Sequence, residues 1–143
     1  MAWFQNEIVL GPYSRGFHLI TGQILAQMPE ISQYRIGIAH LYIQHTSASL
    51  CLNECVEPEV RTDMESYFSR IVPEDRDSYT HTYEGLDDMP AHIKSVLLGV
   101  SVTIPISQGR LSLGRWQGVY LCEHRNRAGS RRLVITLHGD SSS

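Results

Sequence analysis

The segment HTYEGLDDMPAHIK gathers side chains that could bind a metal ion. Its chemically active members within residues 81–94 are His81, Glu84, Asp87, Asp88, His92 and Lys94. Mixed imidazole and carboxylate ligands suit zinc or a similar divalent ion, with a coordination position left for water where the site is catalytic. The spacing matches no HExxH, EF-hand or P-loop motif, so it does not identify the metal. An acidic loop in which Asp88 caps a helix is the alternative interpretation.

A second group of polar residues ends the segment GRWQGVYLCEHR. The centre of this segment is typical of a buried strand, yet Glu123, His124 and Arg125 follow it directly. Because an unpaired buried charge is costly, these side chains must be paired, solvated or in use. Strand alternation places His124 on the same face as Trp116, and Glu123 and Arg125 on the opposite face. An ordinary solvated strand end is the alternative.

A third candidate is His45 in the segment HTSAS. Alternation puts His45 on the apolar face of its strand, and the hydroxyl groups of Thr46, Ser47 and Ser49 follow it. A turn in which these hydroxyls bond their own backbone is the alternative. Asn53 and Glu54 end the next strand, far from His45 in a hairpin, which argues against a direct pairing of His45 with Glu54.

Composition limits the classes of function. The chain of 143 residues has 12 basic and 15 acidic side chains and a formal net charge of −3, and it suits one domain over residues 1–143 with a frayed tail at residues 139–143. This charge gives no general attraction for nucleic acid or for a membrane surface. No apolar run approaches the roughly 20 residues of a membrane span. The N-terminal segment lacks the pattern of a signal peptide, and the three cysteines form no CxxC pair, so we expect a cytoplasmic protein.

Period-two patterns predict that strands predominate. Residues 34–45 alternate with a change of phase near Ala39 and His40, which predicts a β-bulge there. A tight turn at residues 46–48 is then expected to return the chain as the next strand. The other predicted strands cover residues 17–20, 49–53, 100–106, 110–113, 117–123 and 131–137.

Helical spacing appears in three places. Apolar residues at i, i+4, i+7, i+8 and i+11 over residues 60–71 predict an amphipathic helix after Pro58. Pro90 and Gly99 bound a second helix, and a short one is expected at residues 23–28. Residues 72–88, between the helix predicted over residues 60–71 and the helix bounded by Pro90 and Gly99, are polar and irregular. We therefore predict an α+β fold with a largely antiparallel sheet and two or three helices.

Several ordered motifs resemble those of the YjbQ family. They are HTSASL with NE shortly after, PEV followed by Asp63, H-x-x-EG, D-x-MPAHIK, IPI-x-x-G-x-L-x-LG and WQGVYLCEHR. The similarity extends from about Gly16 to Gly139. Members are described as secondary thiamine-phosphate synthases that form homotrimers with an α+β fold, so the resemblance implies that fold, that assembly and a pocket between subunits. Asp88 stands where the family usually has asparagine, which favours a cation there, and Cys55 replaces the usual asparagine after Glu54.

The resemblance and the residue chemistry together assign roles. We expect catalytic roles for His45, Glu84, Glu123 and His124, substrate binding by Thr46, Ser47, Asn53, Lys94, Trp116, Gln117 and Arg125, and metal binding by His81, His92 and His124. The metal would be a divalent ion, zinc first, with magnesium as the choice for a diphosphate substrate. The expected partners are other copies of the chain in a homotrimer and a small phosphorylated molecule, and neither nucleic acid nor membrane.

The resemblance implies a transferase reaction. An aminopyrimidine-methyl diphosphate would lose pyrophosphate, and the nitrogen of a thiazole phosphate would attack the resulting carbon. Lys94, Arg125 and the metal would stabilise charge on the leaving group, and Trp116 would stack on the pyrimidine. Two alternatives use the same residues: a metal-dependent hydrolase of a small phosphorylated molecule, and a trimer that binds a metal or an anion without catalysis.

Overall fold

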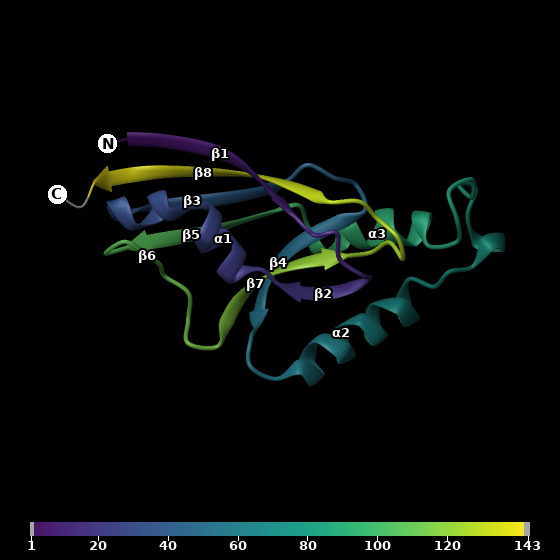
Figure 1. Cartoon of the computed structure of the whole chain (residues 1–143). Helices are drawn as coiled ribbons and strands as arrows, with labels where there is room; N and C mark the ends of the chain where they lie inside the picture. The colour runs from purple at the N-terminus through teal and green to yellow at the C-terminus, as the bar shows by residue number, and fades with distance from the viewer. Residues whose placement is uncertain (1, 142–143) are drawn as a thin grey trace.

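Two antiparallel sheets form the body of the protein (Figure 1). The structure is a computed structural model that describes residues 2–141. Within this part of the chain, one sheet has the strand order β1-β8-β3-β5-β6 and the other the order β2-β7-β4. The strands of the first sheet are β1 (Ala2–Leu10), β8 (Arg131–Ser141), β3 (Tyr34–Ile43), β5 (Ser101–Ser107) and β6 (Arg110–Leu111). Those of the second are β2 (Gly16–Leu19), β7 (Gln117–Glu123) and β4 (Ala48–Glu54).

Residues 2–141 also contain three α-helices and two short 3-10 helices. These are α1 (Thr21–Gln27), η1 (Pro29–Gln33), α2 (Pro58–Ile71), η2 (Arg76–Ser78) and α3 (Asp88–Leu98). Pro58 occupies the first turn of α2, where its missing N–H costs nothing, and Gly99 ends α3 with a φ of 101° that favours glycine. The predicted α+β class, with a largely antiparallel sheet and two or three helices, is confirmed. The helix predicted to open at Pro90 begins two residues earlier, at Asp88.

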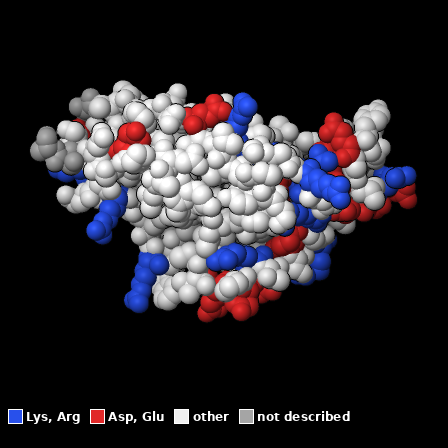
Figure 2. All heavy atoms as spheres, in the orientation of Figure 1, with Lys and Arg blue, Asp and Glu red and all other residues white. Residues whose placement is uncertain are grey.

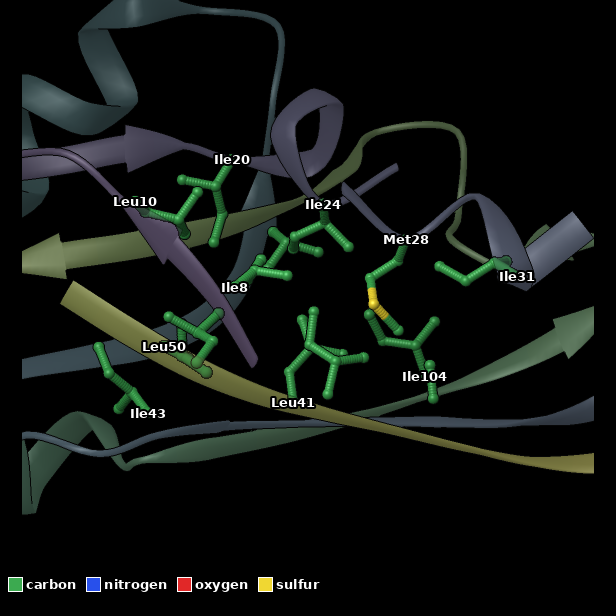
Figure 3. Close-up of a cluster of buried hydrophobic side chains, with 14 of the residues drawn as sticks. Ile8, Leu10, Ile20, Ile24, Met28, Ile31, Leu41, Ile43, Leu50 and Ile104 are labelled. Carbon is green, nitrogen blue, oxygen red and sulfur yellow. The ribbon is translucent and has the colours of Figure 1, made fainter. Parts of the chain in front are cut away.

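The main core lies between the two sheets (Figure 3). Leu41 and Ile104 of the larger sheet meet Leu50 and Leu121 of the smaller one, and Ile24 of α1 closes the space between them. Burying side chains of this kind contributes about 1.5–3 kcal/mol each. This core holds β4 and β7 in place, and these strands carry polar residues at their ends.

Strand β7 separates two apolar clusters by simple alternation. Val119 and Leu121 face the main core, whereas Tyr120 and Cys122 face a second cluster with Phe17. Met64 and Phe68 of α2 pack against this second cluster, so α2 covers the outer face of the smaller sheet. The alternation predicted for this segment therefore matches the structure.

The expected hairpin at residues 46–48 is wrong. Strand β3 pairs with β8 and β5, whereas β4 pairs with β7, so the chain passes from one sheet to the other at this point. The expected bulge near Ala39 and His40 is wrong too, because pairing is continuous from Ile36 to Ile43 and the irregularity lies between Tyr34 and Ile36. The change of phase arises because Ile36 and Ile38 point outward and are 52% and 45% exposed.

The tail was also placed incorrectly. Gly139, Asp140 and Ser141 belong to β8, where Gly139 pairs with Ala2 of β1 and with Gly37 of β3. Residues 142–143 lie outside the described residues. Among the described residues, no helix combines the length and the apolar character that crossing a membrane requires.

Candidate metal site

Three metal-ligating side chains converge where α3 begins. The Asp88 carboxylate is buried, and its Oδ2 atom lies 2.6 Å from His81 Nε2 and 3.2 Å from His92 Nε2. All three atoms lie within 4.8 Å of one another. His92 follows Asp88 by four residues, so one helical turn brings both to the same face, and the preceding loop supplies His81. Two imidazoles and one carboxylate are ligands that suit zinc and related ions.

The orientation of His92 leaves its Nε2 atom suited to a cation. His92 Nδ1 lies 2.7 Å from the carbonyl oxygen of Thr46. A carbonyl only accepts hydrogen bonds, so Nδ1 carries the proton and donates it to Thr46. In the neutral ring, the Nε2 lone pair then faces the Asp88 carboxylate. Two electron-rich atoms at this separation need a proton or a metal ion between them, and a hydrogen bond from the other ring nitrogen to a carbonyl is what usually orients metal-binding histidines.

Arg125 holds the carboxylates around this cluster. Its guanidinium donates to Asp88 Oδ1 at 2.8 Å, to Asp87 Oδ2 at 2.9 Å and to the carbonyl of Glu84 at 2.7 Å. Burial raises the pKa of Asp87, but bonds from Asn126 N–H and Arg125 outweigh it, so the pKa is lowered overall. Arg125 was expected to bind a substrate anion, but the structure directs it onto carboxylates of its own chain.

A pocket of about 420 Å³ adjoins the cluster. It shares His92 with the cluster, and its other lining residues are His45, Thr46, Ser95, Val96 and Val100. Thr46 therefore contributes in two ways, because its carbonyl holds His92 and the residue itself lines the pocket. The lining is mainly apolar, with Val96 84% exposed on α3.

Both ring nitrogens of His45 lie close to arginines of the same chain. Its Nε2 accepts from the Arg132 N–H at 2.9 Å, and its Nδ1 lies 3.2 Å from Arg131 Nη1. Burial and then the charge of Arg131 lower the pKa of His45. The ring is therefore kept neutral, and its nitrogens face the protein. This arrangement suits a positioning role better than the expected catalytic one.

Arg131 is the functional neighbour that the sequence interpretation missed. It forms a buried ion pair with Glu123 and also donates to the carbonyl and the hydroxyl of Ser47, at 3.1 and 3.0 Å. Glu123 is therefore paired inside the protein, whereas it was expected to have a catalytic role. Strand alternation could have indicated that Arg131 is buried, because it lies on the same face as Leu133 and Ile135, which are buried.

His124 lies apart from the cluster that it was expected to join. Its Nε2 is 2.7 Å from Ser49 Oγ, and its buried Nδ1 has no partner among residues 2–141. Burial first, and then the charges of Lys94, Arg131 and Arg15, lower its pKa to about 3. His124 was predicted to be the third metal ligand with His81 and His92, but in the structure the third member of the cluster is Asp88.

Lys94 was expected to contact a phosphate, but its side chain is almost fully buried. Burial lowers the pKa of its amine, followed by the charge of Arg15. The neighbouring carboxylates Glu65, Glu74 and Asp87 act in the opposite direction. Lys94 therefore belongs to the interior beside His124 and not to the wall of the pocket.

The remaining predicted residues are divided between two ends of the smaller sheet. Asn53, Trp116 and Gln117 lie near the end where Glu54 pairs with Gln117, while Ala48 pairs with Glu123 at the other end. Six steps from residue to residue along β4 separate these ends by about 20 Å. Trp116 is exposed and stacks under Arg115. Within one chain, Trp116 and His124 thus cannot share a ligand. Glu84 stays near the cluster, with its carboxylate exposed and 4.0 Å from Arg125.

The fold and this site define a class: a small α+β protein of two antiparallel sheets with a His-Asp-His cluster where a helix begins. A family model described as "UPF0047 protein YjbQ-like" matches residues 6–140. The chain belongs to this UPF0047 family of YjbQ-like proteins. The resemblance noted in the sequence is therefore confirmed.

Individual relatives agree with this membership. The chain is 52% identical over 138 residues to the UPF0047 protein YjbQ of Escherichia coli O157:H7, covering 96% of this chain and 99% of the relative. A UPF0047 protein of Synechocystis sp. is 42% identical over 136 residues, covering 95% and 92%. The structure of an uncharacterized YjbQ/UPF0047 protein from Clostridium acetobutylicum is similar, with a TM-score of 0.81, 29% identity and coverage of 93% and 99%. A YbjQ-like protein of unknown function from Sulfolobus solfataricus P2 has the same fold, with a TM-score of 0.83, 20% identity and coverage of 97% and 99%.

These comparisons correct the expected activity. The relatives carry only the family name, and the Sulfolobus protein is described as being of unknown function. They give no support to thiamine-phosphate synthase activity, and that assignment is withdrawn. The site itself must then indicate the function.

Proposed function

We propose that the protein binds a divalent metal ion through His81, Asp88 and His92 and uses it to hydrolyse a small molecule. Zinc is the ion that we propose first. The observation that carries the proposal is the Nε2 atom of His92, fixed by Thr46 with its lone pair toward Asp88 Oδ2. Two histidines and one carboxylate leave a coordination position for water or a substrate oxygen, as in catalytic zinc sites. Imidazole ligands favour zinc over magnesium, which prefers oxygen.

The charges near the cluster support a cation as the ligand. Asp87, Asp88 and Glu84 bring three carboxylates, and Arg125 already donates to two of them and to a carbonyl. In the face shown in Figure 2, basic and acidic side chains lie intermixed, mainly at the end that carries residues 72–88 and along α2. The carboxylates of Glu84, Asp87 and Asp88 would repel a phosphate at the cluster, whereas they would stabilise a divalent cation.

Zinc titration of chelator-treated protein tests the metal site. Asp88→Asn is expected to abolish binding, because it replaces a charged ligand by a neutral one. Asp87→Asn is the matched control, since Asp87 also bonds Arg125 but contributes no atom to the cluster. Both variants should lose about 1.5–3 kcal/mol of unfolding free energy with one charged hydrogen bond. Equal zinc affinity in the two variants would refute the site.

Turnover separates catalysis from binding. Zinc-loaded wild-type protein is expected to hydrolyse p-nitrophenyl esters, with activity lost in Asp88→Asn and kept in Asp87→Asn. Zinc binding without any zinc-dependent turnover across an ester panel would leave a metal-binding protein and remove the hydrolytic part of the proposal.

We also propose that the protein assembles as a homotrimer. The support is an exposed apolar strip on the outer face of the larger sheet, where Trp3, His138, Ile38 and Pro105 lie side by side on neighbouring strands. Trp3 stacks on His138, and Ile36 and Tyr42 extend the strip. Contiguous apolar patches of this kind mark interaction surfaces.

A further inference from the structure

The pocket that shares His92 with the cluster is suited to a ligand of a definite kind. We infer that it receives the uncharged, ring-sized body of a small molecule whose oxygen atoms bind the metal, an inference that rests on the proposed metal site. Its volume of about 420 Å³ lies in the usual range of small-molecule sites. One wall, His92, belongs to both the pocket and the metal cluster.

The polar groups of the lining are largely committed to the protein. Ser95 Oγ donates to the Ala48 carbonyl at 3.1 Å, His92 Nδ1 donates to the Thr46 carbonyl, and His45 Nε2 accepts from the Arg132 N–H. Within residues 2–141, no hydrogen bond engages the Thr46 hydroxyl, which leaves one polar group for a ligand. A charged group inside this pocket would lose its hydration without finding a partner.

Because these polar groups are engaged within the protein, the apolar lining would supply most of the contact with a ligand. Val96 and Val100 form the apolar wall, and Val96 is 84% exposed in the last turn of α3. No lysine or arginine lines the pocket among the residues that the structure describes. Recognition would therefore combine apolar contact with metal coordination, which excludes a charged body but allows an anionic metal-binding head.

Two hydroxamates test this inference on the zinc-loaded protein. Acetohydroxamate and benzohydroxamate present the same metal-binding group, but only the second carries a ring. Calorimetry should show benzohydroxamate binding about tenfold more tightly, as expected for partial burial of a ring. Val96→Glu should reduce this preference to near one while zinc and acetohydroxamate affinities stay unchanged.

A neighbouring residue gives the matched control. Leu97 is 58% exposed on the same helix but does not line the pocket, so Leu97→Glu should keep the preference of the wild-type protein. Equal affinity of both hydroxamates for wild-type protein would overturn the inference, as would an unchanged preference in Val96→Glu. A change of oligomeric state in Val96→Glu but not in Leu97→Glu, measured by light scattering, would show that another copy covers the pocket and would also overturn it. Absence of zinc uptake, seen in the earlier titration, would instead remove the metal site and this inference together.

Discussion

Arg131 and Glu123 form a two-bonded ion pair in the interior. Arg131 Nε and Nη2 lie 2.8 and 2.5 Å from the two carboxylate oxygens of Glu123, and both side chains are buried. The Arg125 N–H adds a third bond to Glu123 at 3.1 Å. Glu123 ends β7 in the smaller sheet, and Arg131 begins β8 in the larger one. The pair therefore joins the two sheets beside the candidate site.

Breaking this pair should be costly. Glu123→Gln leaves the Arg131 charge buried without a counter-charge, and we expect the unfolding free energy to fall by about 3–5 kcal/mol in urea denaturation. The double variant Glu123→Leu with Arg131→Met should lose less than the sum of the two single variants, because neither charge remains. A loss below about 1 kcal/mol in Glu123→Gln would contradict the importance of the pair.

His124 should make stability depend on pH. Burial and then nearby cations lower its pKa in the folded protein to about 3, whereas the unfolded chain has an ordinary value of about 6.5. Between these values only the unfolded state takes up the proton. The contribution of His124 to stability is complete above about pH 6.5 and is lost as the pH falls toward 3, at about 1.4 kcal/mol per pH unit.

Urea denaturation between pH 7 and pH 4.5 measures this contribution. His124→Asn cannot take up the proton, so its unfolding free energy should fall less steeply than that of the wild-type protein. The comparison uses slopes, since removal of the Ser49 bond changes the baseline. Parallel slopes for the two proteins would show that His124 is not held neutral.

Two facing glycines leave no room for a side chain. Gly37 of β3 and Gly139 of β8 lie opposite each other, and a Cβ atom on Gly37 would overlap the carbonyl oxygen of His138. We expect Gly37→Ala to lower the unfolding free energy by about 1–3 kcal/mol. Gly22→Ala is the control, because nothing lies within 4 Å of its Cβ position in α1, and a gain of up to about 1 kcal/mol is expected. Equal effects in thermal denaturation would contradict this account.

The outer strip of the larger sheet should control assembly. Ile38→Lys places a charge in the centre of the strip and should shift the protein to a smaller species in sedimentation while its circular dichroism is kept. Val56→Lys, at another exposed apolar residue outside this sheet, should leave assembly unchanged. A wild-type protein that is already monomeric would refute the proposed trimer.

Local patterns predicted the parts of the fold that depend on nearby residues. The spacing from Val60 to Ile71 gave α2, and the alternation of Val119, Tyr120 and Leu121 gave the two faces of β7. The partner of β4 could not be predicted in this way. A short connection between two strands usually makes a hairpin. Here β4 pairs instead with β7, which lies far along the chain, so no local pattern indicates the partner.

The candidate site shows the same division between local and distant information. His81 and His92 were predicted as ligands from composition, and Asp88 was noted as favouring a cation. The composition could not show that His124 turns to Ser49, because that contact joins residues 75 positions apart. Ile36 and Ile38 likewise resemble core residues in the sequence, although the fold exposes them.

The strand order also constrains when the protein can fold during its synthesis. Strand β8 lies between β1 and β3, and β7 lies between β2 and β4, so each sheet lacks an inner strand until the last quarter of the chain has emerged from the ribosome. Before that point, β1 has no partner strand and β3 lacks one of its neighbours. Contacts so distant in sequence slow folding, and the unpaired strands are prone to aggregation. Newly made chains should therefore depend on chaperone holding until release.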